Sequence, residues 1–476
     1  MKGDVSRRRR AAALIAISIA LVTASCGSRV SHQAIVSAAH TEVSSGSTQT
    51  GDRGIGPAQG QGAVSSVGTS GASVTTTTLA SSGTGGAAAA LNGSGATSPP
   101  NPIGSTKATT APTATGSTIT IGNVGTYSGL IGAIFAGGQQ TLQVWAAYTN
   151  AHGGLNGHPV HMIIEDDGGD PATNQTETQQ EVTQDHVIAF IGNLVPLTAS
   201  ASVSYLQQQS IPVIGGDASS SVWWQSPMLF PQASFINNES DYSAREAAAA
   251  GYTKIGLLYC IEDATCTAGY TTLVTQGGAK AAGVDVVYSA SYSLTQPDFT
   301  SQCLATQQAG ATAIFFAGDG DSLVRMARDC SAQNFKPEYM ADSIAVGASV
   351  QADPLLNGLL STQSNFPWTD NFTPAQATYQ AAMKTYAPGL AGSATSAAEW
   401  TSGELAVAAD QFLGATPTSA QFLQGLWAIK NNTLGGLAPP LTFNAHALPS
   451  QPSCYFEMVL KNGAFVDTHQ GNYQCF

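Results

Sequence analysis

From residue 117 onward, short apolar runs alternate with longer stretches in which apolar residues recur at helical spacing. The short runs predict strands, and the spacing of Leu142, Val144 and Trp145 predicts a helix over 137–151. In this first block the predicted strands are 119–122, 160–164, 187–192 and 212–214, and the other predicted helices are 171–185 and 199–209.

The same alternation returns in a second block. Its predicted strands are 254–259, 284–287 and 313–316, and its predicted helices are 268–282 and 321–333. Strands and helices in strict alternation favour parallel sheets joined by right-handed crossovers. About 360 residues exceed the usual size of a single core, so we expect an α/β protein with two lobes. Ligands of such sheets bind beyond the carboxyl ends of the strands.

The N-terminus has the layout of an export signal. A basic cluster, Arg7 to Arg10, precedes an apolar run from Ala11 to Val22 and the small residues before Cys26. This layout resembles a bacterial lipoprotein signal (residues 1–25), in which Cys26 becomes the lipidated first residue. Thr23 departs from that pattern, because Leu is usual there. An ordinary signal peptide with an incidental Cys is the alternative, and the apolar run is too short to span a bilayer.

Residues 26–116 are dominated by Ser, Thr, Gly and Ala. A stretch with so few large apolar side chains buries too little surface to offset its ordering entropy, so we expect a disordered tether. Two interpretations remain open. The tether is either a spacer that holds the folded part away from the membrane through a thick cell envelope, or a low-complexity insertion without a function.

Six further cysteines follow in an exported chain, which suggests disulfides. They fall into three local pairs, and we therefore expect the bonds Cys260–Cys266, Cys303–Cys330 and Cys454–Cys475. No Cys-x-x-Cys occurs, so a zinc ribbon or thioredoxin-type site has no support.

The charge is strongly acidic. Residues 117–476 contain 27 acidic and 9 basic residues, a net charge of −18, and no Lys or Arg lies between Lys107 and Arg245. Binding to nucleic acid or to anionic lipid needs clustered basic groups, so neither is expected. An anion bound by the first half would depend on backbone N–H groups and helix N-termini.

Five segments then resemble, in order, the leucine/isoleucine/valine-binding protein family, the type I periplasmic binding proteins. They are the opening strand and loop 121–129, the Asn-x-x-Gly-Gly turn 150–157, the acidic strand end 165–171, and the strands 190–192 and 211–214. The resemblance runs from about Ile119 to the C-terminus and is weak after Pro367.

This resemblance implies a fold and a function. The fold is a two-lobe one, with 117–238 and 368–443 in lobe 1 and 239–367 and 444–476 in lobe 2. The function is that of a lipid-anchored receptor on the outer face of the cell membrane, a monomer without a cofactor. It captures a small polar solute (an amino acid, amide or related compound) and delivers it to the permease subunits of an ABC importer.

The family's ligand loops carry over residue by residue. In lobe 1 the first ligand loop corresponds to residues 193–198, and it has Pro196 where amino-acid binders have Ser. The next ligand loop corresponds to residues 216–219. Pro offers neither a hydroxyl nor an N–H group to a ligand carboxylate. Phe135 falls where an aromatic residue often covers the ligand. The candidate residues of lobe 1 are Tyr127, Ser128, Phe135, Leu194, Val195, Pro196, Thr198, Asp217, Ala218 and Ser219.

In lobe 2 the candidates are Thr267, Asp319, Asp342 and Ser343. Thr267 and Asp319 stand where Tyr is usual, and Ser343 stands where amino-acid binders carry the Glu that receives the ammonium group. These departures disfavour a branched-chain amino acid and favour a neutral or amine-bearing solute. Each residue also has a plainer interpretation: Asp319 and Asp342 as helix N-caps, Pro196 as a loop stiffener, and Phe135 and Tyr127 as core.

The sequence lacks the common motifs of hydrolytic and metal-dependent enzymes. No Gly-x-Ser-x-Gly elbow and no His-Glu-x-x-His occur, and the closest His pair, His158 and His161, straddles Pro159 at a strand start. We therefore expect no catalysis and no metal. A surface sensor domain of the same fold is the alternative function, and a hydrolase is a distant third.

Lipidation at Cys26 has a direct test. In a native-like host the variant Cys26→Ala should leave the membrane fraction, because the thiol that accepts the lipid is gone. Fractionation followed by immunoblotting measures this. A variant that stays membrane-bound and is released only by detergent would contradict the lipid anchor.

Overall fold

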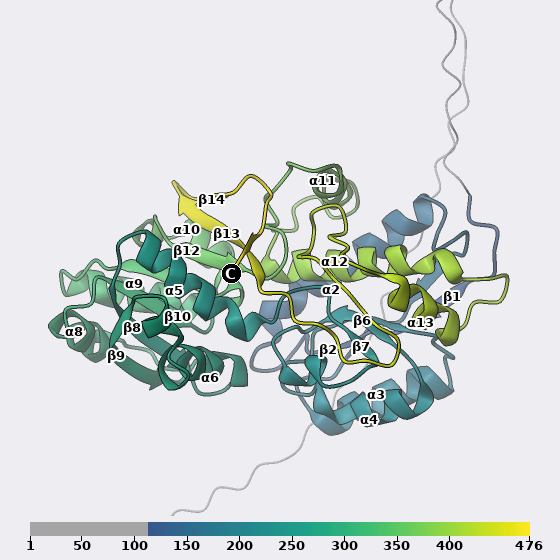
Figure 1. The fold of residues 1–476 in the computed structure, drawn as a ribbon, viewed down its shortest axis with the longest axis horizontal. Coiled ribbons are helices and arrows are strands. Elements are labelled where there is room, and N and C mark those ends of the chain that lie inside the picture. Colours follow the sequence, from purple (N-terminus) through teal and green to yellow (C-terminus); the bar gives the residue numbers. More distant parts are fainter. Residues whose placement is uncertain (1–112) are drawn as a thin grey trace, which may run out of the picture. The chain divides into compact units, whose positions relative to one another are not determined.

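The computed structural model describes residues 113–476. Cys26 and nearly all of the predicted tether lie outside the described residues. The described part is a mixed α/β structure in which helices flank parallel sheets, as the alternation of strands and helices predicts (Figure 1). No helix within residues 113–476 is long and apolar enough to cross a membrane.

The first block of strands forms short parallel ladders that run into one another. β1 pairs with β3, β2 with β4, and β5 with β6 and β7, while a bridge between Gly122 and Phe190 joins the first strand segment to β5. The strands are β1 (Ile119–Ile121), β2 (Val124–Gly125), β3 (Val160–Met162), β4 (Glu165–Asp166), β5 (Phe190–Asn193), β6 (Val213–Gly216) and β7 (Leu229–Phe230).

The second block forms an eight-stranded sheet in the order β14-β13-β12-β11-β10-β8-β9, with β15 paired to β13. The neighbours from β12 to β9 are parallel, and β13, β14 and β15 are antiparallel additions. The strands are β8 (Lys254–Cys260), β9 (Asp285–Tyr292), β10 (Ala313–Ala317), β11 (Glu338–Ala341), β12 (Leu360–Gln363), β13 (Cys454–Lys461), β14 (Ala464–Asp467) and β15 (Gln474–Cys475).

The helices lie between the strands along the chain. They are α2 (Gly132–Ala151), α3 (Pro171–Thr183), α4 (Ser200–Gln209), α5 (Glu239–Ala249), α6 (Ala264–Tyr270), α7 (Gly278–Ala281), α8 (Thr300–Gln308), α9 (Gly320–Ala332), α10 (Ala348–Ala352), α11 (Pro374–Tyr386), α12 (Ala394–Ala409) and α13 (Ser419–Ala428). Together, α11, α12 and α13 separate β12 from β13 along the chain. Short 3-10 turns include η4 (Ser343–Ala345) and η5 (Pro354–Leu356).

Two helices differ from their predicted bounds for physical reasons. α2 begins at Gly132, five residues before the predicted start, and Gly137 and Gly138 lie inside it. A Cβ at Gly138 would lie 2.9 Å from Leu194 Cδ1, so glycine there lets α2 pack closely against the neighbouring loop. The predicted helix 268–282 is instead α6, a π-helical turn over Thr271–Thr275 and α7, separated at Gly277, which has φ of 79°.

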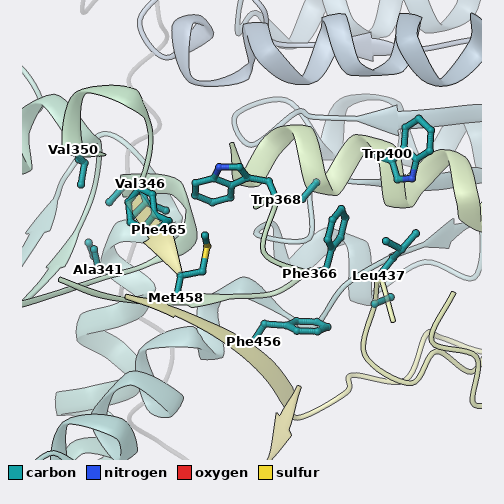
Figure 2. Close-up of a cluster of buried hydrophobic side chains, with 14 of the residues drawn as sticks. Ala341, Val346, Val350, Phe366, Trp368, Trp400, Leu437, Phe456, Met458 and Phe465 are labelled. Atoms are coloured by element: carbon teal, nitrogen blue, oxygen red, sulfur yellow. The ribbon is translucent and has the colours of Figure 1, made fainter. Parts of the chain in front are cut away.

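Part of the core is a set of aromatic contacts that involve the large sheet, the segment after β12, and helices α11 and α12. Trp368 lies 5.3 Å from Phe465 of β14 between ring centroids, and Tyr379 of α11 lies 5.6 Å from Trp400 of α12. Figure 2 shows Trp368 and Trp400 with the β13 residues Phe456 and Met458. All of these side chains are buried. α12 also packs on α2, β5 and β6. Helix α12 therefore links these aromatic contacts to the sheet that contains β5 and β6.

The three predicted disulfides are present in the structure. Cys260–Cys266 joins the end of β8 to α6, Cys303–Cys330 joins α8 to α9, and Cys454–Cys475 joins β13 to β15. Each disulfide thus joins two cysteines that are neighbours among the six cysteines of the sequence, as predicted.

The disulfides should differ in their contribution to stability. Cys303–Cys330 closes a segment of 27 residues and Cys260–Cys266 one of 6. In the chain-entropy model their removal costs about 3.5 and about 2 kcal/mol of unfolding free energy. Urea unfolding of the double variants Cys303→Ser/Cys330→Ser and Cys260→Ser/Cys266→Ser measures the difference. A larger loss in the second variant would contradict this order.

Candidate functional site

The loops that follow four parallel strands supply two adjoining pockets. Leu194 follows β5, Asp217 follows β6, Asp319 follows β10 and Asp342 follows β11. Because these strands belong to both sheets, the pockets draw residues from both blocks of the chain. Phe135 of α2 and Ile344 of η4 line both pockets.

The first pocket has a cavity of about 40 Å³ that is partly open to solvent. Its apolar wall includes Phe135, Leu194 and Ile344, and its polar groups are amides, hydroxyls and one carboxyl. The residues that line it are Phe135, Leu194, Gly216, Asp217, Ala218, Gln232, Ile236, Ser343, Ile344, Gln363, Ser364, Asn365, Ala394, Thr395 and Ala398.

The second pocket has a cavity of about 30 Å³ and three carboxyl groups, those of Asp263, Asp319 and Asp342. Apolar side chains make most of the rest. The residues that line it are Ile131, Ile134, Phe135, Cys260, Asp263, Thr265, Cys266, Leu294, Gly318, Asp319, Asp342 and Ile344. The Cys260–Cys266 disulfide therefore forms part of this wall.

Gly216 and Gln232 shape the floor of the first pocket. The side-chain amide of Gln232 accepts from the N–H of Gly216 at 3.0 Å and donates to the carbonyl of Gly216 at 3.0 Å. Gly216 has φ of 133°, and a Cβ there would lie 2.6 Å from the carbonyl oxygen of Asn193. Only glycine fits this approach, which aligns the ends of β5 and β6 at the pocket.

Asp217 is buried in the first pocket with one oxygen free. Its Oδ1 accepts from the backbone N–H of Ser219 at 3.0 Å and from the Ser219 hydroxyl, while Oδ2 has no partner. Burial raises the pKa of Asp217 from 3.8 to about 7, although the bonds from Ser219 oppose this shift. The Oδ2 atom is thus a buried carboxyl oxygen without a hydrogen-bond partner.

Asp319 and Asp342 both cap helical turns. Asp319 Oδ1 accepts from the N–H of Ser322 at 3.0 Å at the start of α9, and Asp342 Oδ1 accepts from the N–H of Ala345 at 3.1 Å. Capping uses only one oxygen of each, and Asp319 Oδ2 is buried without a partner. Burial also raises the pKa of Asp342 to about 7. Both carboxyls therefore cap a turn and line the second pocket.

Ser343 is held by a buried acid behind the pocket wall. Its N–H and hydroxyl donate to Glu239 Oε2 and Oε1 at 2.8 and 2.9 Å. Glu239 begins α5 and is fully buried, and burial with the nearby Asp342 raises its pKa well above 4.5. The pair fixes the loop after β11, the loop that contributes to both pockets.

No Lys or Arg lines either pocket. Within residues 113–476 the salt bridges are Arg245–Asp241 and Arg328–Asp329, and neither involves a pocket residue. The pockets therefore combine apolar walls, amides and hydroxyls with acidic groups.

Comparison with known families decides the class of this protein. A sequence profile of the periplasmic binding protein family matches residues 118–463. The chain belongs to the periplasmic binding protein family. The resemblance in the five sequence segments and the α/β fold agree with this membership. No curated protein sequence is significantly similar to the chain.

Solved structures share the fold of this periplasmic binding protein at low sequence identity. A possible leucine/isoleucine/valine-binding protein from Rhodopirellula baltica has a TM-score of 0.63 and 19% identity, over 76% of this chain and 98% of that chain. A solute-binding protein of an ABC transporter from R. palustris, in complex with 4-hydroxybenzoate, has a TM-score of 0.62 and 17% identity, over 75% and 97%.

A third similar structure is a fatty acid ABC transporter substrate-binding protein from Thermomonospora curvata. Its TM-score is 0.63 at 16% identity, over 76% of this chain and 93% of that chain. At such identities these likenesses establish the fold of this periplasmic binding protein and leave its ligand open.

Half of the predicted site residues of this periplasmic binding protein meet in the pockets. They are Phe135, Leu194, Asp217, Ala218, Asp319, Asp342 and Ser343. Whether they bind a ligand stays a prediction, because placement in a pocket is geometry alone.

The other predicted residues do not line these two pockets. Tyr127 donates its hydroxyl to Asn123 Oδ1 at 2.7 Å, and Thr198 donates to Asp167 Oδ2 at 2.5 Å. Thr267 is exposed and donates to the carbonyl of Ala264 at 2.9 Å. Ser128 is exposed, Pro196 is half-buried, Ser219 bonds to Asp217, and Val195 lines a separate small cavity beside α4.

Several pocket residues are absent from the sequence prediction. Thr265 and Asp263 stand in the second pocket where Thr267 was expected, because α6 begins at Ala264 and turns Thr267 outward. Gln363 ends β12 and Asn365 follows it, and Asn365 Nδ2 donates to the carbonyl of Gln232 at 3.0 Å. The polar run after β12 was a usable signal, but that strand was not predicted.

The raised pKa of Asp217 predicts a pH-dependent stability. The folded state binds the proton more tightly than the unfolded state, whose pKa is near 3.8. The stabilisation is therefore complete below about pH 4 and is lost as the pH rises towards about 7. Asp217→Asn removes this loss, so its unfolding free energy should rise relative to wild type between pH 4 and 8, as measured by urea unfolding.

Asp170→Asn is the matched control. Asp170 caps α3 through the N–H of Thr173, and that bond lowers its pKa below 3.8. Its titration lies below pH 4, so this variant should show no such trend above pH 4. An unfolding free energy of Asp217→Asn that runs parallel to wild type at every pH would refute the buried, raised-pKa carboxyl.

Proposed function

We propose that this periplasmic binding protein is an extracytoplasmic receptor for a neutral or amine-bearing small polar solute, which it delivers to an ABC importer. The observation that carries the proposal is the composition of the two pockets. Strand ends of both sheets supply carboxyls, amides and an aromatic wall, and no basic residue lines them.

The second pocket supports an amine-bearing group. Asp319 and Asp342 retain carboxylate oxygens that face it, and Asp263 adds a third acid. A buried carboxylate with a free oxygen gains most from a positively charged donor, since a charge-assisted bond is about twice as strong as a neutral one. An ammonium group would also offset the mutual repulsion of these acids.

A free carboxylate is disfavoured at the same place. The helix N-termini that could bind an anion begin at α9 and η4, but Asp319 and Asp342 already occupy their N–H groups. Two of the similar structures are named for acidic solutes. One is a solute-binding protein in complex with 4-hydroxybenzoate, and the other is a substrate-binding protein of a fatty acid ABC transporter. We propose a different solute class for this chain.

The first pocket suits the neutral part of the solute. Gln363, Asn365 and Thr395 offer both donors and acceptors, while Phe135 and Leu194 offer apolar cover. A ligand that contacts residues from both sheets stabilises a closed form through those contacts, which are lost in an open form. The division into lobe 1 (117–238 and 368–443) and lobe 2 (239–367 and 444–476) is part of this proposal, as is the lipid anchor at Cys26.

Removal of the charge at two capping positions tests the solute class. A thermal-shift panel of amino acids, amino amides, polyamines and aromatic acids first identifies a bound amine. Asp319→Asn and Asp342→Asn keep an N-capping side chain but lose the charge. We expect weaker amine binding by about 1.5–3 kcal/mol, or roughly 10- to 150-fold in Kd, measured by calorimetry. A neutral analogue of the same solute should bind the variants and wild type alike.

Asp353→Asn is the matched control, because Asp353 caps η5 in the same way but lines neither pocket. It should leave the Kd unchanged. Unchanged amine binding in both Asp319→Asn and Asp342→Asn would remove these residues from the site. Binding of the aromatic acids alone would refute the amine-bearing or neutral class.

A further inference from the structure

Three potential metal ligands converge away from the two pockets. They are Glu246 on α5, Glu457 on β13 and His469 in the turn after β14. One ligand atom from each lies within 4.8 Å of the others. These residues are far apart in the sequence, and the C-terminal hairpin brings two of them against α5.

The turn that carries His469 is held by the same strand as Glu457. Thr468 donates its hydroxyl to Glu457 Oε1 at 2.9 Å, and its N–H donates to the carbonyl of Glu457 at 3.3 Å. The N–H of His469 donates to Asp467 Oδ1 at 2.6 Å. The two side chains are therefore positioned by the hairpin itself.

The atoms that face one another have no partners of their own. Glu457 is 5% exposed, and its Oε2 is buried without a hydrogen bond, as is His469 Nε2. The hydroxyl of Tyr242, a buried neighbour one turn before Glu246 on α5, lies against the Glu246 carboxylate. Buried polar atoms are nearly always paired, so the free atoms of Glu457 and His469 indicate an absent partner.

No positive side chain of the described residues compensates the two glutamates. Arg245 is adjacent in sequence but pairs with Asp241 at 3.4 Å and lies over the ring of Phe476 at 4.5 Å. Neither salt bridge of residues 113–476 includes Glu246 or Glu457. Two carboxylates and an imidazole without a countercharge are a donor set for a cation.

We propose that Glu246, Glu457 and His469 bind one divalent transition-metal ion of the zinc type. An imidazole nitrogen with carboxylate oxygens suits zinc and its neighbours, whereas Ca²⁺ and Mg²⁺ prefer oxygen alone. At bond lengths of about 2.0–2.2 Å, tetrahedral ligands lie roughly 3.3 Å apart. The side chains, now within 4.8 Å, would draw together by a change of rotamer.

The ion would tie α5 to the C-terminal hairpin. β13 is already joined to β15 by Cys454–Cys475, and α5 packs on β12 next to β13. None of the three ligands lines the solute pockets, so this site stands apart from the proposed solute function.

Calorimetry with ZnCl₂ tests the site on the full-length protein, prepared without a histidine tag and treated with chelator. We expect one zinc per chain and a zinc-dependent rise in Tm. Glu246→Gln and His469→Gln should each weaken zinc binding roughly tenfold or more. Glu246 and His469 are only half-buried, so these variants should fold. The control His161→Gln, an exposed His outside the cluster, should bind zinc as wild type does.

Several outcomes would overturn the proposal. One is that His469→Gln binds zinc as tightly as wild type. Another is that His469→Gln and His161→Gln lose the same amount of zinc affinity. CaCl₂ that binds more tightly than ZnCl₂ at this site would also refute it, because the imidazole would then contribute nothing. Circular dichroism of each variant without metal confirms that lost binding is not lost folding.

Discussion

The scarcity of positive charge governs how this protein holds its buried acids. Residues 117–476 have 27 acidic and only 9 basic side chains, and the salt bridges of the described residues involve exposed arginines. Buried carboxyls therefore depend on N–H and hydroxyl donors, as Asp167 does on Thr126, Asn174 and Thr198. Where donors are missing, as at Glu399, burial raises the pKa well above 4.5 and favours the neutral acid.

The same constraint links the fold to the pockets. Glu239 at the start of α5 orders the loop after β11 through Ser343, and Asp217 orders its own loop through Ser219. Asp319 and Asp342 each use one oxygen to start a helical turn. Asp217, Asp319 and Asp342 thus stabilise these loops and also line the two pockets.

Much of the fold could be predicted because the pattern of apolar residues is local. β8, β10 and α9 lie within one or two residues of their predicted bounds. The bounds of α2 and of the helix predicted over 268–282 differ from the structure, because α2 continues through Gly137 and Gly138 while the second helix is interrupted at Gly277. The sequence pattern did not predict strands β11 to β15. Of these, β13 and β14 join the sheet antiparallel, and only after the long segment that contains α11 to α13.

By itself the sequence determined the alternation of strands and helices, the acidic charge, the three local disulfide pairs and the family, because each depends on residues close in the chain or on composition. Through the family resemblance it also pointed to Asp217, Asp319 and Asp342 as candidates, and all three line the pockets. Tertiary structure alone decided that Thr267 faces away while Asp263 and Thr265 line the pocket, because the start of α6 sets which side chains point inward. It alone joined Glu246 to Glu457 and His469, because that contact requires the hairpin to pack on α5.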